Sequence, residues 1–240
     1  MPPSLLKSVN RDVGKAIHQY DMISHGDRIV VGVSGGKDSL TLLWLLKERL
    51  SRIPVSYELF PVYIDPGFPG GFADELKKWV ETLGLTLRVE HTDDGIRAHS
   101  AENRENPCFL CSRLRRKKIF DITGELGCNK IAFGHHKDDI IETFFLNICF
   151  SGMMAAMRPV QPFFDGRFSI IRPLAFVEED RIECLARKND FPEFVNSCPY
   201  GKISKRKEIK DLLGQLYQTN KKIKGNIFRS LSNINHEYLL

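Results

Sequence analysis

The 240-residue sequence contains no apolar run long enough to cross a membrane, which takes roughly 20 consecutive apolar residues. Its first 15 residues, MPPSLLKSVNRDVGK, also lack the apolar core of a secretory signal. We therefore expect a cytoplasmic protein that makes no membrane contact. In that reducing compartment the six cysteines are not expected to form structural disulfides, which leaves buried thiols, metal ligands or reactive groups.

The two best-known glycine-rich nucleotide motifs are missing as well. A Walker loop requires Gly, four residues and then Gly-Lys-Ser/Thr, whereas here Asp38 follows Lys37 and Val31 takes the place of the first glycine. The dinucleotide fingerprint does not fit either. What is present is SGGKDS at 34–39, between an apolar strand-like run and a helical pattern. Glycines expose backbone N–H groups and a helix start is electropositive, so this loop is predicted to bind phosphate, with Asp38 holding a cation.

Short runs rich in β-formers alternate with helical patterns along the first half of the chain. The predicted strands are 28–33, 57–64, 85–90 and 130–134, and the predicted helices are 40–50, 72–83 and 114–126. This alternation predicts an α/β fold with a doubly wound, mainly parallel sheet, whose ligands bind beyond the carboxyl ends of the strands. We expect a helical segment at 1–27, the α/β domain at 28–175 and a helical, basic segment at 176–240, with an extended excursion at 159–173.

A second polar motif follows the strand-like run KIAFG. It reads Gly134-His135-His136-Lys137-Asp138-Asp139 and opens a further helical pattern. Two carboxylates at a helix start are also explained by simple capping. Asp65 ends the second predicted strand, so three strand ends are expected to meet in one cleft.

The cysteines divide into two groups. Cys108 and Cys111 form a CxxC motif, and Cys198 follows 87 residues later, immediately before a proline. Three thiolates are too few for a closed zinc site but suit an open 4Fe–4S cluster, and redox exchange is the alternative for the CxxC pair. The other cysteines lie within or beside apolar helical patterns and are predicted to be buried: Cys128, Cys149 and Cys184.

The positive charge is concentrated near the C-terminus. Residues 201–240 contain nine Lys or Arg and three Asp or Glu, a net charge of +6 in a chain whose total is +5. Such a segment is typical of contact with a nucleic-acid backbone, and a solvated helical face is the alternative.

The loop SGGKDS resembles the PP-loop of ATP pyrophosphatases, which cleave ATP between its α- and β-phosphates. Together with CxxC-x₃-RR, GHHKDD and the later single cysteine, it resembles the tRNA 2-thiocytidine synthetase family, which is similar to the tRNA 2-thiouridine synthetases. The resemblance implies a Rossmann-like PP-loop fold of the adenine nucleotide alpha hydrolase type. It implies nucleotide contacts at Val33, Ser34, Gly35, Gly36, Lys37, Asp38, Ser39, Asp65, Gly134, His135, Asp138 and Asp139. The resemblance also implies catalytic roles for four residues: Lys37, Asp38, Arg115 and Asp138. It implies cluster ligands at Cys108, Cys111 and Cys198, and Mg²⁺ ligands at Asp38 and Asp139.

The reaction implied by the resemblance has two steps. The C2 oxygen of a pyrimidine, cytidine 32 of tRNA, attacks the α-phosphate of ATP, and sulfur from the cluster then replaces that oxygen while AMP leaves. Arg115, with Arg113 and Arg116, would stabilise charge on the α-phosphate. The implied partners are tRNA and a sulfur donor, either a cysteine desulfurase or free sulfide, and a homodimer is one option.

Several alternatives stay open. The adenylate can be attacked by another nucleophile, as in tRNA-lysidine synthetases, in which case the three cysteines are dispensable. The base can be uridine, the CxxC can carry a persulfide in place of a cluster, or the chain can be a nucleotide-binding iron–sulfur redox sensor without turnover. The tail beyond Cys198 matches the family only loosely, and single-stranded RNA recognition depends on such segments.

Overall fold

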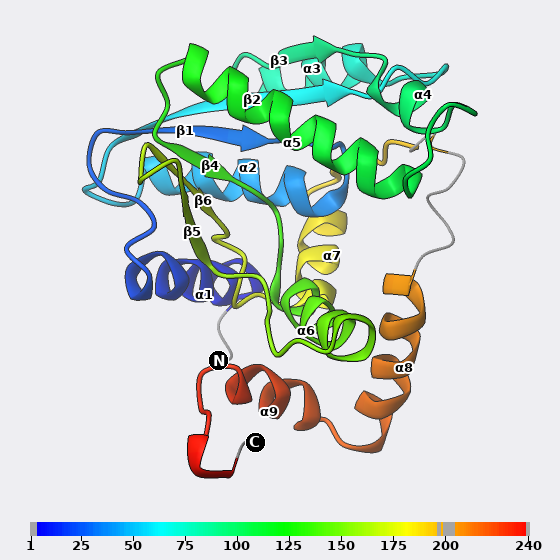
Figure 1. The fold of residues 1–240 in the computed structure, drawn as a ribbon. Coiled ribbons are helices and arrows are strands. Elements are labelled where there is room, and N and C mark those ends of the chain that lie inside the picture. The colour runs from blue at the N-terminus through cyan, green and yellow to red at the C-terminus, as the bar shows by residue number, and fades with distance from the viewer. Residues whose placement is uncertain (1–3, 196–197, 199–204, 239–240) are drawn as a thin grey trace.

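A six-stranded sheet forms the centre of the computed structural model, which describes residues 4–195, 198 and 205–238 (Figure 1). The strand order is β3-β2-β1-β4-β6-β5. Neighbouring strands are parallel except at the edge, where β5 pairs antiparallel with β6. The strands are β1 (Asp27–Gly32), β2 (Tyr57–Asp65), β3 (Arg88–His91), β4 (Lys130–Ala132), β5 (Val160–Phe163) and β6 (Phe168–Ile171). The predicted mainly parallel sheet is confirmed, and the excursion at 159–173 is the β5–β6 hairpin.

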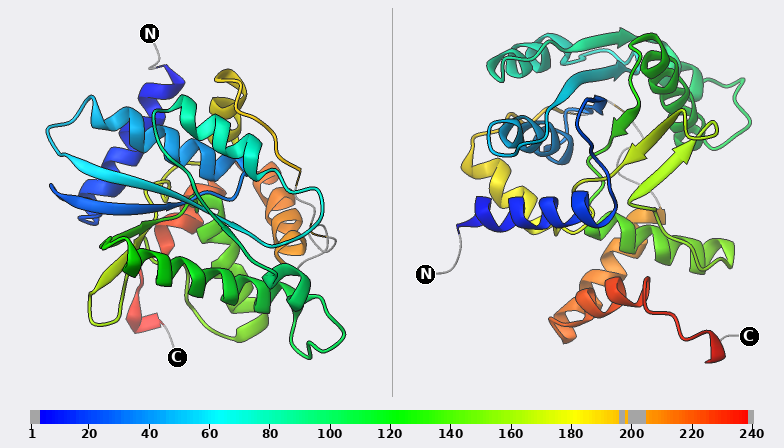
Figure 2. Two further views of the ribbon diagram at one scale, coloured as in Figure 1. Left: turned by 90° about the horizontal axis from the view of Figure 1, so that it is seen from above. Right: turned by 90° about the vertical axis from the view of Figure 1, so that its left-hand side faces the viewer.

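Helices cover both faces of this sheet, as the prediction of a doubly wound fold requires (Figure 2). They are α1 (Leu5–Gln19), α2 (Lys37–Leu50), α3 (Ala73–Thr82), α4 (Asp94–Ala98), α5 (Pro107–Glu125), α6 (Lys137–Ser151), α7 (Glu179–Lys188), α8 (Lys205–Thr219) and α9 (Ile223–Ser230), followed by a 3₁₀ turn, His236–Tyr238. On one face, α1, α2, α3 and α7 share a core in which Leu40 and Leu43 are fully buried. On the other face, Ile119 and Ile122 of α5 pack with Val30 of β1.

The segments outside the predicted α/β domain pack differently at the two ends. Val9 and Val13 of α1 are fully buried in the same core as α2, so the N-terminal helix is part of the main packing unit. In contrast, Ile209 and Leu213 of α8 form a smaller cluster with Ile141 of α6. The division into three segments stays a prediction. No helix in the described part of the chain is long and apolar enough to span a membrane.

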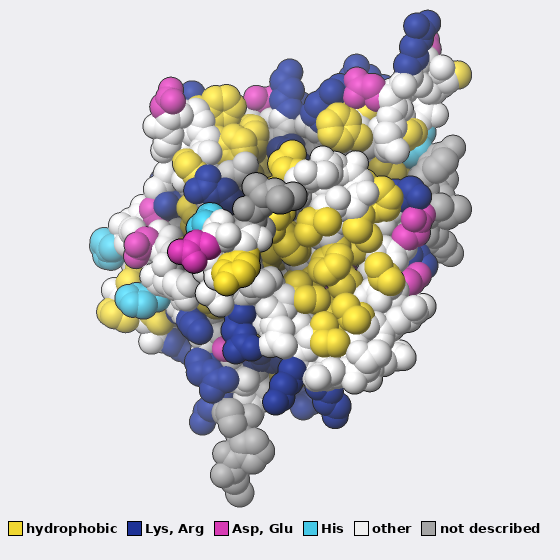
Figure 3. Space-filling model, turned by 60° about the horizontal axis from the view of Figure 1, so that its bottom comes forward, with side chains coloured by type: hydrophobic (Ala, Val, Ile, Leu, Met, Phe, Trp, Pro, Cys, Tyr) yellow, Lys and Arg dark blue, Asp and Glu magenta, His cyan; other side chains and the backbone are white. Residues whose placement is uncertain are grey.

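The C-terminal end of α6 lies in an exposed apolar surface. Figure 3 shows apolar side chains gathered on this side of the molecule, and the exposed large residues here include Ile148, Phe150 and Leu212. Cys149 is exposed too, so the prediction that it is buried is wrong. The reason is that the apolar pattern of α6 continues beyond the part of the helix that Ile209 and Leu213 cover. Cys128 is buried as predicted, and Cys184 is half-buried.

Candidate active site

The loop between β1 and α2 is a tight turn whose shape requires glycine. Gly35 has a φ of +81°, and a Cβ atom at this position would lie 2.5 Å from the ring of Phe72. The Ser39 hydroxyl joins the two sides of the turn: it accepts a hydrogen bond from Ser34 N–H at 3.0 Å and donates one to the Gly36 carbonyl at 2.9 Å. The sequence motif therefore forms a rigid loop at the start of a helix, which is the geometry that favours anions.

The second motif packs directly against this loop. A Cβ atom on Gly134 would lie 2.9 Å from the Asp38 carbonyl and from Ser39 N. His136 is almost fully buried, and its Nε2 lies 3.8 Å from an Asp38 carboxylate oxygen and 3.4 Å from one of Asp139. The backbone N–H of His136 donates to Asp139 at 3.0 Å. The expected meeting of the first and fourth strand ends is thus observed, and it brings Asp38 and Asp139 to the same histidine.

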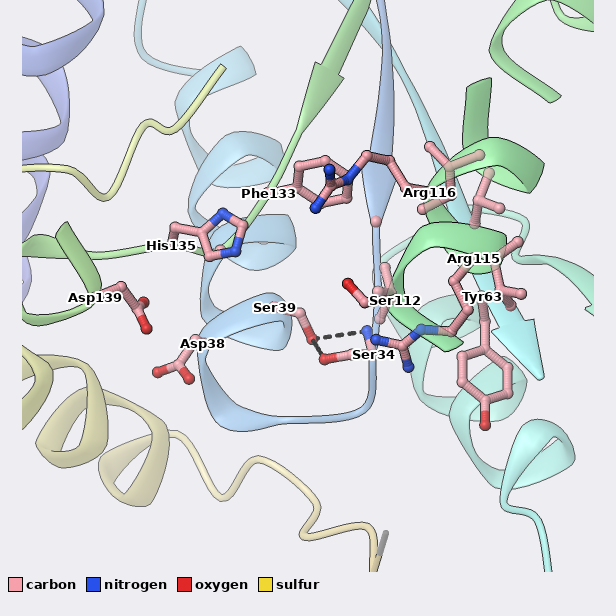
Figure 4. Close-up of a pocket in the computed structure, with 16 residues that line it drawn as sticks. Ser34, Asp38, Ser39, Tyr63, Ser112, Arg115, Arg116, Phe133, His135 and Asp139 are labelled. Atoms are coloured by element: carbon pink, nitrogen blue, oxygen red, sulfur yellow. Dashed lines mark hydrogen bonds between the residues drawn. The ribbon is translucent and has the colours of Figure 1, made fainter. Parts of the chain in front are cut away.

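A cavity of about 310 Å³ opens at the carboxyl ends of β1, β2 and β4 (Figure 4). Its walls come from the two motifs, from β2 and from α5: Gly32, Val33, Ser34, Asp38, Ser39, Val62, Tyr63, Ile64, Ser112, Arg115, Arg116, Ile119, Phe133, Gly134, His135 and Asp139. Arg115 reaches from α5 toward the wall that carries Ser34 and Ser39, and Arg116 reaches from the same helix toward Phe133. The volume is in the range of small-molecule sites, and the lining combines an apolar half with converging charges.

The two carboxylates in this cavity fit a bound cation. Burial raises the pKa of Asp38, although His136 and Lys37 oppose the shift. One carboxylate oxygen of Asp38 is buried without a hydrogen-bond partner among the described residues, although Lys37 Nζ is 3.5 Å away. Asp139 lies 3.5 Å from the guanidinium of Arg206 in α8. Hard cations such as Mg²⁺ take carboxylate oxygens of this kind as ligands.

Lys37 is held in an ion-pair network at the start of α7. Its Nζ donates to a Glu179 carboxylate oxygen at 3.0 Å, and Lys210 of α8 binds the same carboxylate at 2.6 Å. Burial alone would lower the pKa of Lys37, but Asp38 and Glu179 outweigh it and raise the pKa. Burial would likewise raise the pKa of Glu179, but the two lysines lower it to about 2. Lys37 is therefore a fixed positive charge.

Some of the predicted residues lie outside the cavity. Asp138 is buried, with one carboxylate oxygen accepting from Glu179 N–H at 2.8 Å and the other 2.7 Å from Lys224 Nζ, so it orders the start of α7. Asp65 accepts from Gly67 N–H at 2.9 Å and orders the turn after β2. Gly35, Gly36 and Lys37 line a neighbouring cavity of about 530 Å³ between the loop and the end of α7, and Asp38 borders both cavities.

Sequence reasoning missed several lining residues. Ser112 directly follows the CxxC motif. It lies one helical turn before Arg115 and Arg116, so this spacing could have indicated that Ser112 faces the cavity. Arg113, grouped with those two arginines, instead pairs with Glu105 at 3.0 Å. Tyr63 and Phe133 lie within strand-like runs, where the sequence pattern does not distinguish a residue that lines the cavity from one that is buried in the core. His135 has its pKa lowered to about 4 by burial and by Arg172, so this side chain is a neutral part of the wall.

The CxxC motif lies on the first turn of α5, the helix that also supplies Arg115. Cys108 is exposed, whereas Cys111 and Cys198 are half-buried. Burial raises the pKa of Cys111, Arg115 lowers it, and the nearby thiols of Cys198 and Cys108 raise it further. The three predicted ligands are therefore within electrostatic reach of one another. Residues 196–197 and 199–204, which flank Cys198, lie outside the described residues.

The three thiols are a donor set of the kind that holds an iron–sulfur cluster. In the parts of the chain that the structure describes, no three His, Cys, Asp or Glu side chains are placed to hold one metal ion. An iron–sulfur cluster is held by thiolates, and Arg115 opposes the rise in the pKa of Cys111 that burial causes.

The glycine turn, the second strand-end motif and the cavity between them define a nucleotide-binding α/β protein of the PP-loop class. A family model described as "PP-loop domain" matches residues 5–198. The tRNA-cytidine(32) 2-sulfurtransferase of Geobacter sulfurreducens is 40% identical over 98% of this chain and 92% of its own length, and that of Geotalea uraniireducens is 38% identical over 98% and 95%. The chain therefore belongs to the tRNA-cytidine(32) 2-sulfurtransferase family of PP-loop proteins.

Solved structures agree with this assignment. The U34-tRNA thiolase NcsA from Methanococcus maripaludis, solved with its 4Fe–4S cluster, superposes with a TM-score of 0.78 at 26% identity, covering 98% of this chain and 80% of that one. An NH₃-dependent NAD synthetase from Campylobacter jejuni has a TM-score of 0.55 at 14% identity, covering 96% and 93% of the two chains. The second likeness supports the fold alone.

Proposed function

We propose that this protein is an ATP-dependent tRNA sulfurtransferase that replaces the C2 oxygen of cytidine 32 with sulfur. One observation carries the proposal: the PP-loop and the cysteine-bearing helix form opposite walls of one cavity. Ser34 and Ser39 line the first wall, and Ser112 and Arg115, which directly follow the CxxC motif, line the second. Activation of the base and delivery of sulfur must act on the same carbon, so both groups must face a common space.

The first step is adenylation. The nucleoside of ATP would lie in the apolar half of the cavity with its phosphates on the loop, and Asp38 and Asp139 would hold Mg²⁺, which when bound would neutralise phosphate charge. The C2 oxygen forms a bond to the α-phosphorus while the bond to the β-phosphate oxygen breaks and pyrophosphate leaves. Arg115 stabilises the negative charge that builds up on the α-phosphate, because it faces the loop across the cavity, and Arg116 adds a second positive charge to the same cavity.

The second step is replacement of the activated oxygen. Cys108, Cys111 and Cys198 would hold a 4Fe–4S cluster, which when bound supplies an iron that presents sulfur to C2. Burial raises the pKa of Cys111, and Arg115 opposes this shift, so the arginine partly offsets the cost of forming the thiolate that such ligation needs. Adenylation has turned the C2 oxygen into a leaving group, so a C2–S bond forms, the C2–O bond breaks and AMP departs.

A single anaerobic experiment tests the proposal. The purified protein is incubated with unmodified tRNA, MgATP and sulfide as the sulfur source, and nucleosides are analysed by mass spectrometry alongside AMP. We expect 2-thiocytidine and AMP in equal amounts. The expected loss of thiolation in Cys111→Ser is compared with Cys184→Ser, a change outside the cavity that should leave the yield unchanged.

The outcomes separate the alternatives. AMP formation with a lysine- or ammonia-derived base, and full activity of Cys111→Ser, would indicate another nucleophile. 2-Thiouridine would move the target base, thiolation by a protein without cluster absorbance would indicate a persulfide, and nucleotide binding without AMP would indicate a sensor.

A further inference from the structure

A third hollow, larger than the two cavities beside the loop at 34–39, lies next to the first turn of α6. Its volume is about 600 Å³, and it is formed by α1, the start of α6, the segment before β5, the start of α7 and α9. We name it the basic groove after the five cations that line it: Lys15, Lys137, Arg158, Arg181 and Arg229. It is separate from the PP-loop cavity but close to it, because Lys137 directly follows His136 in the sequence and Glu178, also in the groove, directly precedes Glu179.

Two of the five cations are neutralised within the groove. Arg181 pairs with Asp12, and Lys137 binds Glu178 at 2.7 Å. For Lys15, Arg158 and Arg229, no carboxylate lies within 4 Å in the part of the chain that the structure describes. These three side chains come from three different elements and are exposed, so a net charge of +3 faces solvent along the rim. An arrangement of this kind attracts a polyanion.

The groove has an aromatic floor beneath these cations. Tyr20 and Phe176 have ring centroids 5.8 Å apart, and Phe176 and Phe228 are also 5.8 Å apart, which places three half-buried rings in a row. Lys15 Nζ lies 5.4 Å from the Phe176 centroid, and Lys137 Nζ lies 5.5 Å from that of Phe228. A free phosphate would make no favourable contact with these rings. Single-stranded RNA offers both phosphates that bind the cations and bases that stack on aromatic side chains.

We propose that the basic groove binds the backbone of the substrate RNA, with Lys15, Arg158 and Arg229 on phosphates and an unpaired nucleotide against the aromatic floor. This inference rests on the proposed function, since it assigns a second contact surface to the same RNA. The groove and the PP-loop cavity lie on either side of the first turn of α6, so one RNA strand that touches both would be held in register with the reacting base.

The test compares two double variants that remove the same charge. Arg158→Gln/Arg229→Gln changes the rim of the groove, and Lys77→Gln/Lys78→Gln changes two exposed lysines of α3. Binding of tRNA is measured by filter retention over a series of KCl concentrations. Each lost phosphate contact lowers the slope of log affinity against log salt by about 1, so we expect a decrease of about 2 for the groove variant and none for the control.

A third variant tests the aromatic floor. Phe228→Leu keeps an apolar side chain and leaves the charge unchanged, so tRNA binding should weaken severalfold with an unaltered salt slope. Binding of a non-hydrolysable ATP analogue should be the same in all variants, which shows that they are folded.

Two results would overturn the inference. One is an equal salt slope in the groove variant, the control and the wild type. The other is groove-dependent binding of AMP or inorganic phosphate with no change in tRNA affinity. If tRNA binding depends on the groove while no 2-thiocytidine forms, the proposed function fails and the groove assignment stands. Normal thiolation with an unchanged slope would instead support the proposed function and overturn the groove assignment.

Discussion

Glu179 is expected to contribute stability that depends on pH, because two lysines hold its carboxylate. Lys37 and Lys210 approach it at 3.0 and 2.6 Å, and they lower its pKa from 4.5 to about 2 against the effect of burial. A shift of about 2.5 units corresponds to at most about 3.4 kcal/mol at roughly 1.36 kcal/mol per unit. The lysine side chains are 34% and 51% exposed, so water screens the pair and we expect about 1–2 kcal/mol for Glu179→Gln.

The sign follows from the lowered pKa. The stabilisation is fully present above pH 4.5 and is lost as the pH falls through 2, because the unfolded carboxylate then takes up protons first. Urea unfolding of the wild type and Glu179→Gln at pH 7, 5 and 3 should show a difference in unfolding free energy that is constant down to pH 5 and falls to less than about half at pH 3. Glu81→Gln, which removes an exposed carboxylate of α3, is the matched control. A difference that does not change with pH, or one that equals the control, would refute the reasoning.

Two further predictions concern Lys37 of the PP-loop and Gly134, which packs against that loop. Lys37→Met should reduce AMP formation by about 100-fold or more while leaving the absorbance of the reconstituted cluster intact, because the proposed function places this charge on the ATP phosphates, and Lys37 pairs with Asp38 and Glu179 and not with a thiol. Loss of both together would mean that its role is misplaced. Gly134→Ala should lower the free energy of unfolding by about 1–3 kcal/mol and abolish binding of an ATP analogue, since its Cβ would lie 2.9 Å from the Asp38 backbone. Gly225→Ala in α9, where no atom lies within 4 Å of the added Cβ, should instead raise the free energy of unfolding by roughly 0.5–1 kcal/mol. Equal effects of the two alanine substitutions in calorimetry would contradict the packing argument.

Local patterns were enough to predict the framework of the site. The loop at 34–39 and the motif at 134–139 each follow an apolar run and open a helix, so strand, turn and helix could be recognised from consecutive residues. Parallel strands place their carboxyl ends at one edge, which is why the two motifs were expected to meet. The predicted start of the third strand, residue 85, was less accurate. Pairing with β2 begins only at Arg88, which lies opposite Val62.

Side-chain direction within the motifs could not be predicted in the same way. Asp138 and Asp139 are neighbours at the start of α6, but successive residues on a helix point about 100° apart. Asp139 therefore faces the cavity while Asp138 faces α7 and Lys224. The pairing of Lys37 with Glu179 spans 142 positions in the sequence, and no local pattern marks Glu179 as part of the site.

Part of the positive charge of residues 201–240 contacts carboxylates of the protein itself, whereas the sequence alone suggested contact with nucleic acid. Three cations of this segment neutralise carboxylates around the PP-loop: Arg206 lies beside Asp139, Lys210 beside Glu179 and Lys224 beside Asp138. An acidic site that must accept a polyphosphate needs nearby positive charge, because like charges at short range would otherwise raise the carboxylate pKa values and repel the nucleotide. These three cations are therefore paired with carboxylates around the nucleotide site. The cations that we propose for RNA contact come only in part from this segment: Arg229 lies on α9, whereas Lys15 and Arg158 lie on α1 and before β5.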